Sequence, residues 1–351
     1  MDKKRGIAVV GYGGMGGWHV SLLSSMPEMN VKGIVDILPE RRKAAEDAGI
    51  FAYESFAAML EDEEVELIVI ATPNDTHRSI AIQAMEAGKN VICEKPVALN
   101  CAELQEMIDS AAKNKVIFTV HQNRRWDEDY LIAKQLYETN TLGKVFNIES
   151  RVHGSRGIPG DWRNTKKCGG GMVLDWGVHL IDQILMMMSD RKLLSLYATL
   201  SFVTNEEVDD GFKILLTFEG PMTCLIEVGT SNFIHLPRWY LQGENGSAII
   251  EDWNLNGKIV MVSDWEKRDA VPVVTSAGLT KTMAPRTSET IKEYPLNRIP
   301  SDIKDYYRNV MKAIDGKEKQ IVRHDQVMNS MRIMEAVFWS AQENKVVFFD
   351  R

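Results

Sequence analysis

Three side chains in this sequence have the types and the setting that acid–base chemistry requires. Lys95 follows a short apolar run and precedes a proline, while Asp175 and His179 stand four residues apart behind the glycines at 169–171. Residues four apart on a helix share one face, and glycines let a ligand approach the backbone closely. An imidazole can take a hydroxyl proton, and an ammonium can stabilise the negative charge that develops on the same oxygen. We therefore predict that Lys95, Asp175 and His179 are catalytic and that no metal is needed.

Each of these residues also has a structural interpretation. A lysine before a proline is usually a surface residue, and a histidine on an apolar helix usually belongs to the core. Asp182 lies one further turn along the face that carries Asp175 and His179. Its interpretation as a structural residue is favoured, with orientation of the His179 ring as the alternative.

A glycine-rich segment follows the first apolar run. Residues 11–16 read Gly11-Tyr12-Gly13-Gly14-Met15-Gly16, which is the pattern G-x-G-x-x-G. The first glycine makes a tight turn, the second lets a diphosphate approach the backbone, and the third lets the following helix pack on the strand. A strand before this segment and a helix after it make a dinucleotide site the favoured interpretation.

Asp36 follows the second apolar run about 20 residues after the glycines, where a carboxylate can take both ribose hydroxyls of NAD. The same carboxylate would repel the 2′-phosphate of NADP. Arg41 and Arg42 could hold that phosphate, but a solvated helix start is the favoured interpretation of both arginines. The sequence therefore predicts NAD as the cofactor, with NADP as the less favoured alternative.

The first third of the chain alternates strand-like and helix-like segments. Strands are expected at 6–10, 31–35, 66–71, 90–93 and 116–120, and amphipathic helices at 16–26, 40–48, 77–88 and 101–114. Asn100 and Glu103 are expected to cap the helix at 101–114, and Gly88 to end the helix before it. Nearly continuous apolar strands that alternate with helices indicate a parallel, doubly wound sheet, here an α/β Rossmann domain over residues 1–122.

The remainder, residues 123–351, has a different pattern. Helices are expected at 127–139 and 172–188 and a long strand at 144–153, and successive strands with turn signals fill 193–263. Residues 264–299 have weak periodicity, which indicates a long loop with short strands. Helices near 301–315 and 324–344 end the chain, and one of them could pack back on the first domain. We predict an α+β domain with a large open, mostly antiparallel sheet.

Composition excludes several classes of protein. The chain has 351 residues, of which 44% are hydrophobic and 26% charged, and its formal net charge is −8. An acidic chain is a poor partner for nucleic acid. Its four cysteines show no C-x-x-C spacing, so neither a zinc site nor a disulfide framework is indicated. No apolar stretch approaches the roughly 18 residues of a membrane span, and the first apolar run is too short for a signal peptide. We expect a cytoplasmic protein.

Four motifs in order resemble those of the glucose–fructose oxidoreductase/inositol dehydrogenase (Gfo/Idh/MocA) family. They are the glycine segment at 11–16, Ala71-Thr72-Pro73-Asn74-Asp75-Thr76-His77, Glu94-Lys95-Pro96, and the run from Gly169 to His179. The resemblance covers most of the chain, although residues 193–351 carry no sharp motif. It implies an oxidoreductase with a Rossmann domain and a substrate-binding second domain.

The resemblance also implies roles for individual residues. Cofactor contacts are expected from Gly11, Gly13, Gly14, Met15, Gly16, Asp36, Ile37, Thr72, Pro73, Asn74, His77, Glu94, Lys95, Trp162 and Arg163. Substrate contacts are expected from Lys95, Arg124, His153, Trp162, Asp175 and His179. Trp162 and Arg163 belong to a loop that covers the nicotinamide in some members of the family.

The activity implied is hydride transfer between a nicotinamide and a secondary ring hydroxyl or ketone of a sugar, glycoside or inositol. His179 takes the hydroxyl proton, Lys95 stabilises the same oxygen, and Asp175 fixes both the hydroxyl and the lysine. One alternative is an enzyme that holds NAD tightly and uses transient oxidation to cleave or epimerise glycosides. Another is a non-catalytic dinucleotide sensor, which would need only the glycines and Asp36.

The expected partners are a neutral carbohydrate or polyol and further copies of the chain. The resemblance implies a homo-dimer or homo-tetramer formed through the open sheet. Arg163, Lys166 and Lys167 form a cation cluster on the loop at 155–172. If this cluster folds inward, a sugar acid or a phosphorylated sugar becomes an alternative substrate.

Overall fold

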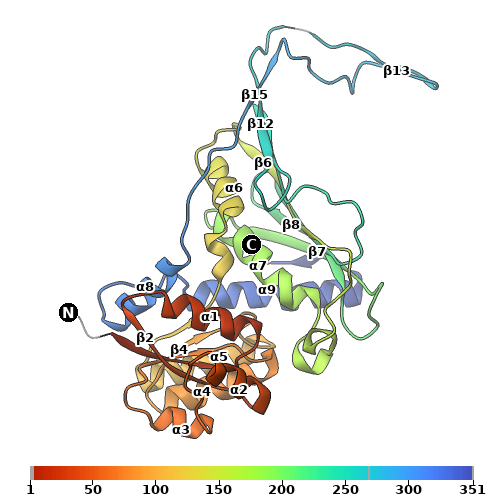
Figure 1. Ribbon diagram of the computed structural model, residues 1–351. Coiled ribbons are helices and arrows are strands. Elements are labelled where there is room, and N and C mark those ends of the chain that lie inside the picture. The colour runs from red at the N-terminus through yellow and green to blue at the C-terminus, as the bar shows by residue number, and fades with distance from the viewer. Residues whose placement is uncertain (1–3, 268, 350–351) are drawn as a thin grey trace.

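The computed structural model describes residues 4–267 and 269–349 (Figure 1). Its first sheet has five strands in the order β2-β1-β3-β4-β5, and every neighbouring pair is parallel. The strands are β1 (Arg5–Val10), β2 (Met29–Val35), β3 (Leu67–Ile70), β4 (Asn90–Cys93) and β5 (Phe118–Val120). The predicted parallel sheet is therefore confirmed. Because strand order reverses between β1 and β3, the carboxyl ends of these two strands flank the crevice where such sheets bind ligands.

Five helices connect these strands, and the alternating pattern predicts four of them. They are α1 (Gly14–Ser24), α2 (Pro39–Asp47), α3 (Phe56–Glu61), α4 (His77–Glu86) and α5 (Cys101–Asn114). The Asn100 side chain accepts a hydrogen bond from Glu103 N at 2.9 Å, and Gly88 follows α4 with φ of +75°, so both predicted helix ends are confirmed. The sequence analysis missed α3, because six residues are too few for a helical period to show.

The second sheet has nine strands in the order β15-β12-β11-β10-β6-β9-β8-β7-β16. Its strands are β6 (Val145–His153), β7 (Leu193–Ser201), β8 (Gly211–Phe218), β9 (Met222–Gly229), β10 (Trp239–Gly243), β11 (Gly246–Ile250), β12 (Gly257–Val262), β15 (Ile291–Tyr294) and β16 (Val347–Phe348). Over the described residues β6 and β9 pair in parallel and all other neighbours are antiparallel. The predicted mostly antiparallel sheet is confirmed.

One face of this sheet is covered by helices and the other is open. The covering helices are α6 (Glu128–Glu138), α7 (Val178–Met187) and α9 (His324–Glu343), which pack on the same side in Figure 1. Side chains alternate along a strand, and on β8 Ile214 and Leu216 are buried whereas Lys213 and Leu215 point to the open face. No helix of the described residues is both long and apolar enough to cross a membrane.

The C-terminal elements run back across the first sheet. The hydroxyl of Tyr307, on α8 (Lys304–Ile314), lies 2.7 Å from His19 Nδ1 on α1. His324 Nε2, at the start of α9, lies 2.8 Å from the backbone oxygen of Phe118 on β5. These contacts join α8 and the start of α9 to the Rossmann sheet.

Residues 264–299, where the sequence shows weak periodicity, are mostly irregular. A short hairpin of β13 (Val273–Thr275) and β14 (Gly278–Thr280) projects away from the body of the molecule (Figure 1). The chain then returns through β15 to the edge of the nine-stranded sheet. The prediction of a long loop with short strands agrees with this arrangement.

Candidate functional site

The glycine segment forms a narrow turn between β1 and α1. Gly11 has φ of +90°, and a Cβ on Gly16 would lie 1.8 Å from the backbone oxygen of Gly11. Only glycine fits at either position, because a side chain would be strained at the first and would collide with backbone at the second. A Cβ on Gly14, at the start of α1, would meet nothing within 4 Å. The turn thus leaves open backbone at a helix N-terminus, which suits a dinucleotide diphosphate.

Asp36 is fixed beside this turn at the end of β2. Its carboxylate accepts hydrogen bonds from Tyr12 N at 2.7 Å and from Leu38 N at 2.9 Å. Arg41 Nη1 donates to the backbone oxygen of Tyr12 at 3.0 Å, and Arg42 Nη1 donates to the backbone oxygen of Asp36 at 2.6 Å. Both arginines therefore hold backbone beside the glycine turn, and Arg41 Nη1 lies 2.9 Å from the place that a Cβ on Gly13 would take. Met15 and Ile37 flank the turn as exposed side chains.

The motif after β3 ties neighbouring loops together. His77 is buried, with Nε2 2.9 Å from the Thr72 oxygen and Nδ1 2.9 Å from the Pro96 oxygen. Asn74 Nδ2 donates to the Gly169 oxygen at 2.8 Å. The side chains of His77 and Asn74 thus brace the loop that follows Lys95 and the loop that precedes Asp175. Thr72 and Pro73 lie just after the carboxyl end of β3.

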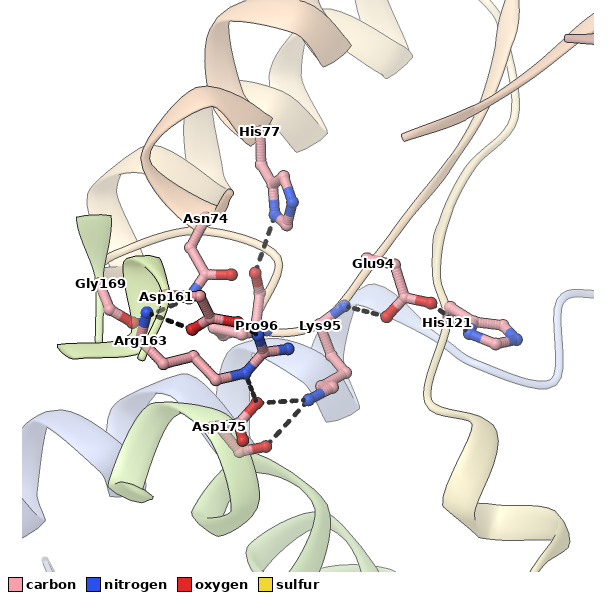
Figure 2. Close-up of polar contacts among 10 residues, drawn as sticks. All are labelled: Asn74, His77, Glu94, Lys95, Pro96, His121, Asp161, Arg163, Gly169 and Asp175. Carbon is pink, nitrogen blue, oxygen red and sulfur yellow. Dashed lines mark hydrogen bonds and ion pairs between the residues drawn. The ribbon is translucent and has the colours of Figure 1, made fainter. Parts of the chain in front are cut away.

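The centre of the site is the contact between Lys95, just after β4, and Asp175 (Figure 2). Lys95 Nζ donates to Asp175 Oδ1 at 3.1 Å and to the Asp175 backbone oxygen at 3.0 Å. Arg163 Nε lies 3.4 Å from the same carboxylate oxygen. Burial disfavours the charged carboxylate, but Lys95 and Arg163 outweigh it and hold the pKa of Asp175 below its usual value.

The four-residue spacing predicts that Asp175 stands on a regular α-helix, but the structure differs at this point. Residues Val173–Gly177 form a π-helical turn, η5, which leads into α7. The wider turn changes the angle between Asp175 and His179 along the helix, and such turns are frequent at functional sites. Asp209 fixes its start, since the carboxylate accepts from Val173 N at 2.7 Å and the backbone oxygen accepts from Met172 N at 2.9 Å.

His179 lies one turn after Asp175 and is almost fully buried. Its Nδ1 has no hydrogen-bond partner among the described residues. Burial, with Lys95 and then Arg124 as nearby cations, holds the pKa of His179 well below 6.5. The ring is therefore neutral at pH 7, which is the form that accepts a proton.

Asp182 has a structural partner. Arg125 Nε and Nη2 each lie 2.7 Å from one of the two carboxylate oxygens of Asp182, and both side chains are buried. Arg125 Nη1 also donates to Gln326 Oε1 on α9 at 2.8 Å. This bidentate pair joins η2 (Asn123–Trp126), α7 and α9. It supports the structural interpretation of Asp182, whereas His179 Nδ1 receives no hydrogen bond from this carboxylate.

The side chain of Glu94 turns away from the Lys95 side chain toward His121 (Figure 2), and it belongs to a buried ring of polar groups with His19, His121 and Tyr307. Glu94 Oε1 lies 2.8 Å from His19 Nε2 and 2.8 Å from His121 Nδ1, and Tyr307 Oη lies 2.7 Å and 3.2 Å from the other nitrogens of these two rings. Burial raises the pKa of Glu94, but His121 and His19 outweigh it, so the pKa is well below its usual value. Glu94 Oε2 accepts from Lys95 N at 3.1 Å, so the ring lies directly behind the lysine.

The sequence analysis missed His19 and Tyr307 in this ring. No local pattern relates residues 19, 94, 121 and 307, which four different elements bring together. The ligand-type atoms of His19, Glu94 and His121 lie within 4.8 Å of one another. Each of these atoms already has a hydrogen-bond partner in the protein.

His153 is not brought to the Lys95–Asp175 contact. His153 stands two residues after Arg151 on β6, so both side chains point to the open face of the sheet, as does that of Glu227 on β9. The distance between His153 Nε2 and Glu227 Oε1 is 3.7 Å. Leu236 N donates to His153 Nδ1 at 3.3 Å. The helix that carries His179 packs on the opposite face, which explains the separation.

The loop before Asp175 turns one of its three cations inward. Arg163 stacks on Trp162, with 4.4 Å between guanidinium and ring, and Arg163 Nη1 lies 2.7 Å from Asp161 Oδ2. Lys166 and Lys167 are exposed. Arg163 and Trp162 thus stand over the Lys95–Asp175 contact as one stacked pair.

Arg124, on η2, lies near His179 of α7. Its guanidinium is 4.3 Å from the Trp176 ring and 5.3 Å from the Trp253 ring, and Nη1 lies 2.8 Å from Asp127 Oδ2. Trp176 is the residue after Asp175, but Trp253 comes from the turn between β11 and β12.

Comparisons with known proteins agree with this geometry. Residues 5–122 match the model for an oxidoreductase family with an NAD-binding Rossmann fold, and residues 130–249 match the GFO/IDH/MocA C-terminal domain. The crystal structure of an NAD-binding protein from Listeria innocua superposes with a TM-score of 0.95 at 46% identity, covering 99% of this chain and 100% of that one.

Several curated relatives are named for an activity. The chain is 24% identical to scyllo-inositol 2-dehydrogenase (NADP(+)) IolW of Bacillus subtilis, over 98% of this chain and 96% of the relative. It is 28% identical to myo-inositol 2-dehydrogenase of Thermotoga maritima, over 58% of this chain and 60% of the relative.

Asp209 predicts an unusual dependence of stability on pH. Burial raises the pKa of Asp209 to about 7, whereas the unfolded chain releases this proton near pH 4. Between these values the folded protein binds more protons, so this residue lowers the free energy of unfolding as pH rises. Asp209→Asn keeps an acceptor for Val173 N and does not titrate. In urea unfolding, the free energy of unfolding of the variant should rise relative to that of the wild type by on the order of 1.4 kcal/mol per pH unit from pH 4 to 7, a few kcal/mol in all.

Asp210→Asn is the matched control. Hydrogen bonds from Thr204 and Ser201 outweigh burial and lower the pKa of Asp210, so its stabilisation is present above about pH 4 and is lost as pH falls. The control variant should therefore be less stable than the wild type by an amount that stays constant from pH 4 to 7 and shrinks only below about pH 4. A difference between Asp209→Asn and the wild type that is independent of pH would contradict the role given to Asp209.

Proposed function

The chain belongs to the GFO/IDH/MocA family of NAD-binding oxidoreductases, and on this premise we propose that it transfers a hydride between NAD and a secondary ring hydroxyl or ketone of a neutral sugar, glycoside or inositol. The observation that carries the proposal is the contact of Lys95 with Asp175, beside a buried and neutral His179. This contact lies at the carboxyl end of β4, next to the crevice that the glycine turn opens. It brings an ammonium, a carboxylate and a base to one point.

The roles of the three side chains follow from their charges. NAD, when bound, accepts the hydride from the substrate carbon. The neutral imidazole of His179 accepts the hydroxyl proton in the direction of oxidation. The ammonium of Lys95 donates a hydrogen bond to the same oxygen and stabilises its developing negative charge. Asp175 orients Lys95 and can accept a hydrogen bond from a neighbouring hydroxyl.

The balance of charge supports a neutral substrate. Lys95 and Arg163 share Asp175, Arg163 has a second partner in Asp161, and Arg124 pairs with Asp127. Arg163 does fold inward, but each inward cation already faces a carboxylate. An acidic or phosphorylated substrate would need cations in excess. A polyhydroxylated ring needs many polar partners without net charge, and two inositol dehydrogenases are among the relatives.

The position of Asp36 supports NAD as the preferred cofactor. Two backbone N–H groups hold its carboxylate at the end of β2, beside the turn that suits the diphosphate. A 2′-phosphate at this place would meet a fixed negative charge. Arg41 is the competing group, because its guanidinium lies beside the same turn.

We expect Lys95→Ala and His179→Ala each to lower the rate of the chemical step at least about a hundredfold, the usual scale for acid–base groups. Single-turnover kinetics measures this step, and NADH fluorescence titration should show little change in cofactor affinity for His179→Ala. Lys213→Ala and His235→Ala, which remove exposed side chains of the same types, are the controls. Turnover near that of the wild type in either active-site variant would remove that residue from the mechanism.

We expect a higher kcat/KM with NAD than with NADP. Asp36→Ala should lower the ratio of kcat/KM with NAD to kcat/KM with NADP, because it removes the charge that repels the 2′-phosphate. Glu40 is an exposed acid four residues further on, and Glu40→Ala should leave this ratio unchanged. Steady-state kinetics with both cofactors makes the comparison. A wild-type preference for NADP that Arg41→Ala abolishes would show that the arginine decides the cofactor.

A substrate panel with NAD tests the reaction itself. Glucosides, free hexoses, inositols, sugar acids and simple 2-hydroxy acids should give activity concentrated among the neutral rings. The kcat/KM for a neutral ring should exceed that for the matching sugar acid at least about tenfold, because each inward cation among the described residues faces a carboxylate. Activity confined to 2-hydroxy acids or to sugar acids would overturn the assignment to neutral ring hydroxyls.

A further inference from the structure

Trp253 is a half-exposed indole held on a tightly tied turn. Its side chain is 51% exposed, yet the turn between β11 and β12 is fixed by Asp252. Asp252 Oδ1 accepts from Asn254 N at 2.9 Å, Oδ2 accepts from Asn256 Nδ2 at 2.7 Å, and Glu251 N donates to the Asn256 oxygen at 2.7 Å. A single exposed aromatic residue is ordinary. A large apolar ring held rigidly beside an active site can bind without ordering the turn first.

One face of this indole is already covered from within the protein. The guanidinium of Arg238 lies 3.9 Å from the ring centre, and Arg238 is buried. Arg238 is fixed in turn by Asp129, with 2.6 Å between Nη2 and Oδ2. The indole is thus oriented from behind, and the exposed half of its surface is free for a ligand.

A chain of ring contacts leads from Trp253 to the catalytic base. The Trp253 and Trp176 ring centres are 6.0 Å apart at 47°, and the Trp176 and His179 ring centres are 5.9 Å apart. Trp176 also follows Asp175 directly, so it lies at the border of the Lys95–Asp175 contact. The two indoles form an angled wall that begins at the acid–base centre and ends at the surface.

Arg124 adds polar groups to this wall. Its guanidinium lies between the two indoles, and its Nε is buried without a hydrogen-bond partner in the described part of the chain. Its charge is balanced by Asp127, as that of Arg238 is balanced by Asp129. The wall therefore offers two aromatic surfaces and an unused donor, with no net charge.

We propose that Trp176 and Trp253 form a second sugar subsite, which binds the neighbouring pyranose ring of a neutral disaccharide or glycoside while the first ring is oxidised at Lys95 and His179. The C–H faces of a sugar stack on indoles, and its hydroxyls accept from arginine. The exposed surface of Trp253 receives one face of the second ring, Trp176 contacts the edge of that ring nearer the acid–base centre, and Arg124 bonds its hydroxyls. The inference rests on the proposed function, since it extends the same site outward.

Kinetics with one-ring and two-ring substrates tests the subsite. Methyl β-D-glucopyranoside is the one-ring substrate, and cellobiose and maltose are the two-ring substrates, each with NAD. Trp253→Ala should raise KM for at least one disaccharide roughly threefold to tenfold, the loss expected of one stacking contact. The KM for the one-ring substrate should stay within twofold. Trp253→Phe, which keeps a flat ring, should recover most of the disaccharide affinity.

Trp339→Ala is the matched control, because Trp339 on α9 is 49% exposed but has no place in the wall. It should leave KM for all three substrates unchanged. Equal changes in KM for one-ring and two-ring substrates in Trp253→Ala would overturn the subsite, and so would unchanged KM values for both disaccharides. In either case activity on the single ring would leave the proposed function standing.

Calorimetric binding to the NADH-loaded protein separates the two proposals. Cellobiose or maltose should bind the wild type and Trp339→Ala, and should bind Trp253→Ala at least threefold more weakly. If no sugar is oxidised but this pattern of binding holds, the proposed reaction fails and the subsite stands. If neither disaccharide binds the wild type, the subsite is wrong.

Discussion

The rest of the site depends on one partly buried ion pair, between Lys95 and Asp175. Its partners come from the end of β4 and from the turn before α7, 80 residues apart, so the pair forms only when both parts of the chain are correctly packed. Taking two charges out of water is costly unless their geometry and hydrogen bonds repay the loss. Here the lysine contacts two oxygens of the same residue, Arg163 adds a second cation, and the hydrogen bond from Asn74 to Gly169 holds the surrounding loops together.

Burial and neighbouring charges together set the protonation states of the groups around this pair. Burial, with Lys95 and Arg124 as nearby cations, keeps His179 neutral, while two histidines outweigh the burial of Glu94 and keep it ionised behind Lys95. Burial of Asp209 outweighs the backbone hydrogen bonds that it accepts, and this residue holds the first turn of the catalytic segment. The polar groups at the site are thus tuned by different neighbours, although all of them lie within the same packed interior.

Aromatic and guanidinium groups shape the outer part of the cleft. Trp162 with Arg163, and Trp176 and Trp253 with Arg124 and Arg238, form stacked pairs in which a carboxylate balances each cation. Such pairs provide flat apolar surfaces and directed donors without net charge. This combination suits a polyhydroxylated ring better than an anion.

The sequence by itself determined what depends on short stretches of chain. The glycine turn, the alternation of strands and helices, the Asn100 cap, both sheet types and the family all follow from local spacing, because steric limits and hydrophobic period act over a few residues. The domain boundary at 122/123 and the roles of the individual site residues stay predictions.

Tertiary structure alone decided which distant side chains meet. Arg125 became the partner of Asp182, Glu94 joined His19, His121 and Tyr307, His153 fell on the open face of the sheet, and Trp253 reached Arg124. No local period encodes such pairings, because they depend on how whole sheets and helices pack against one another.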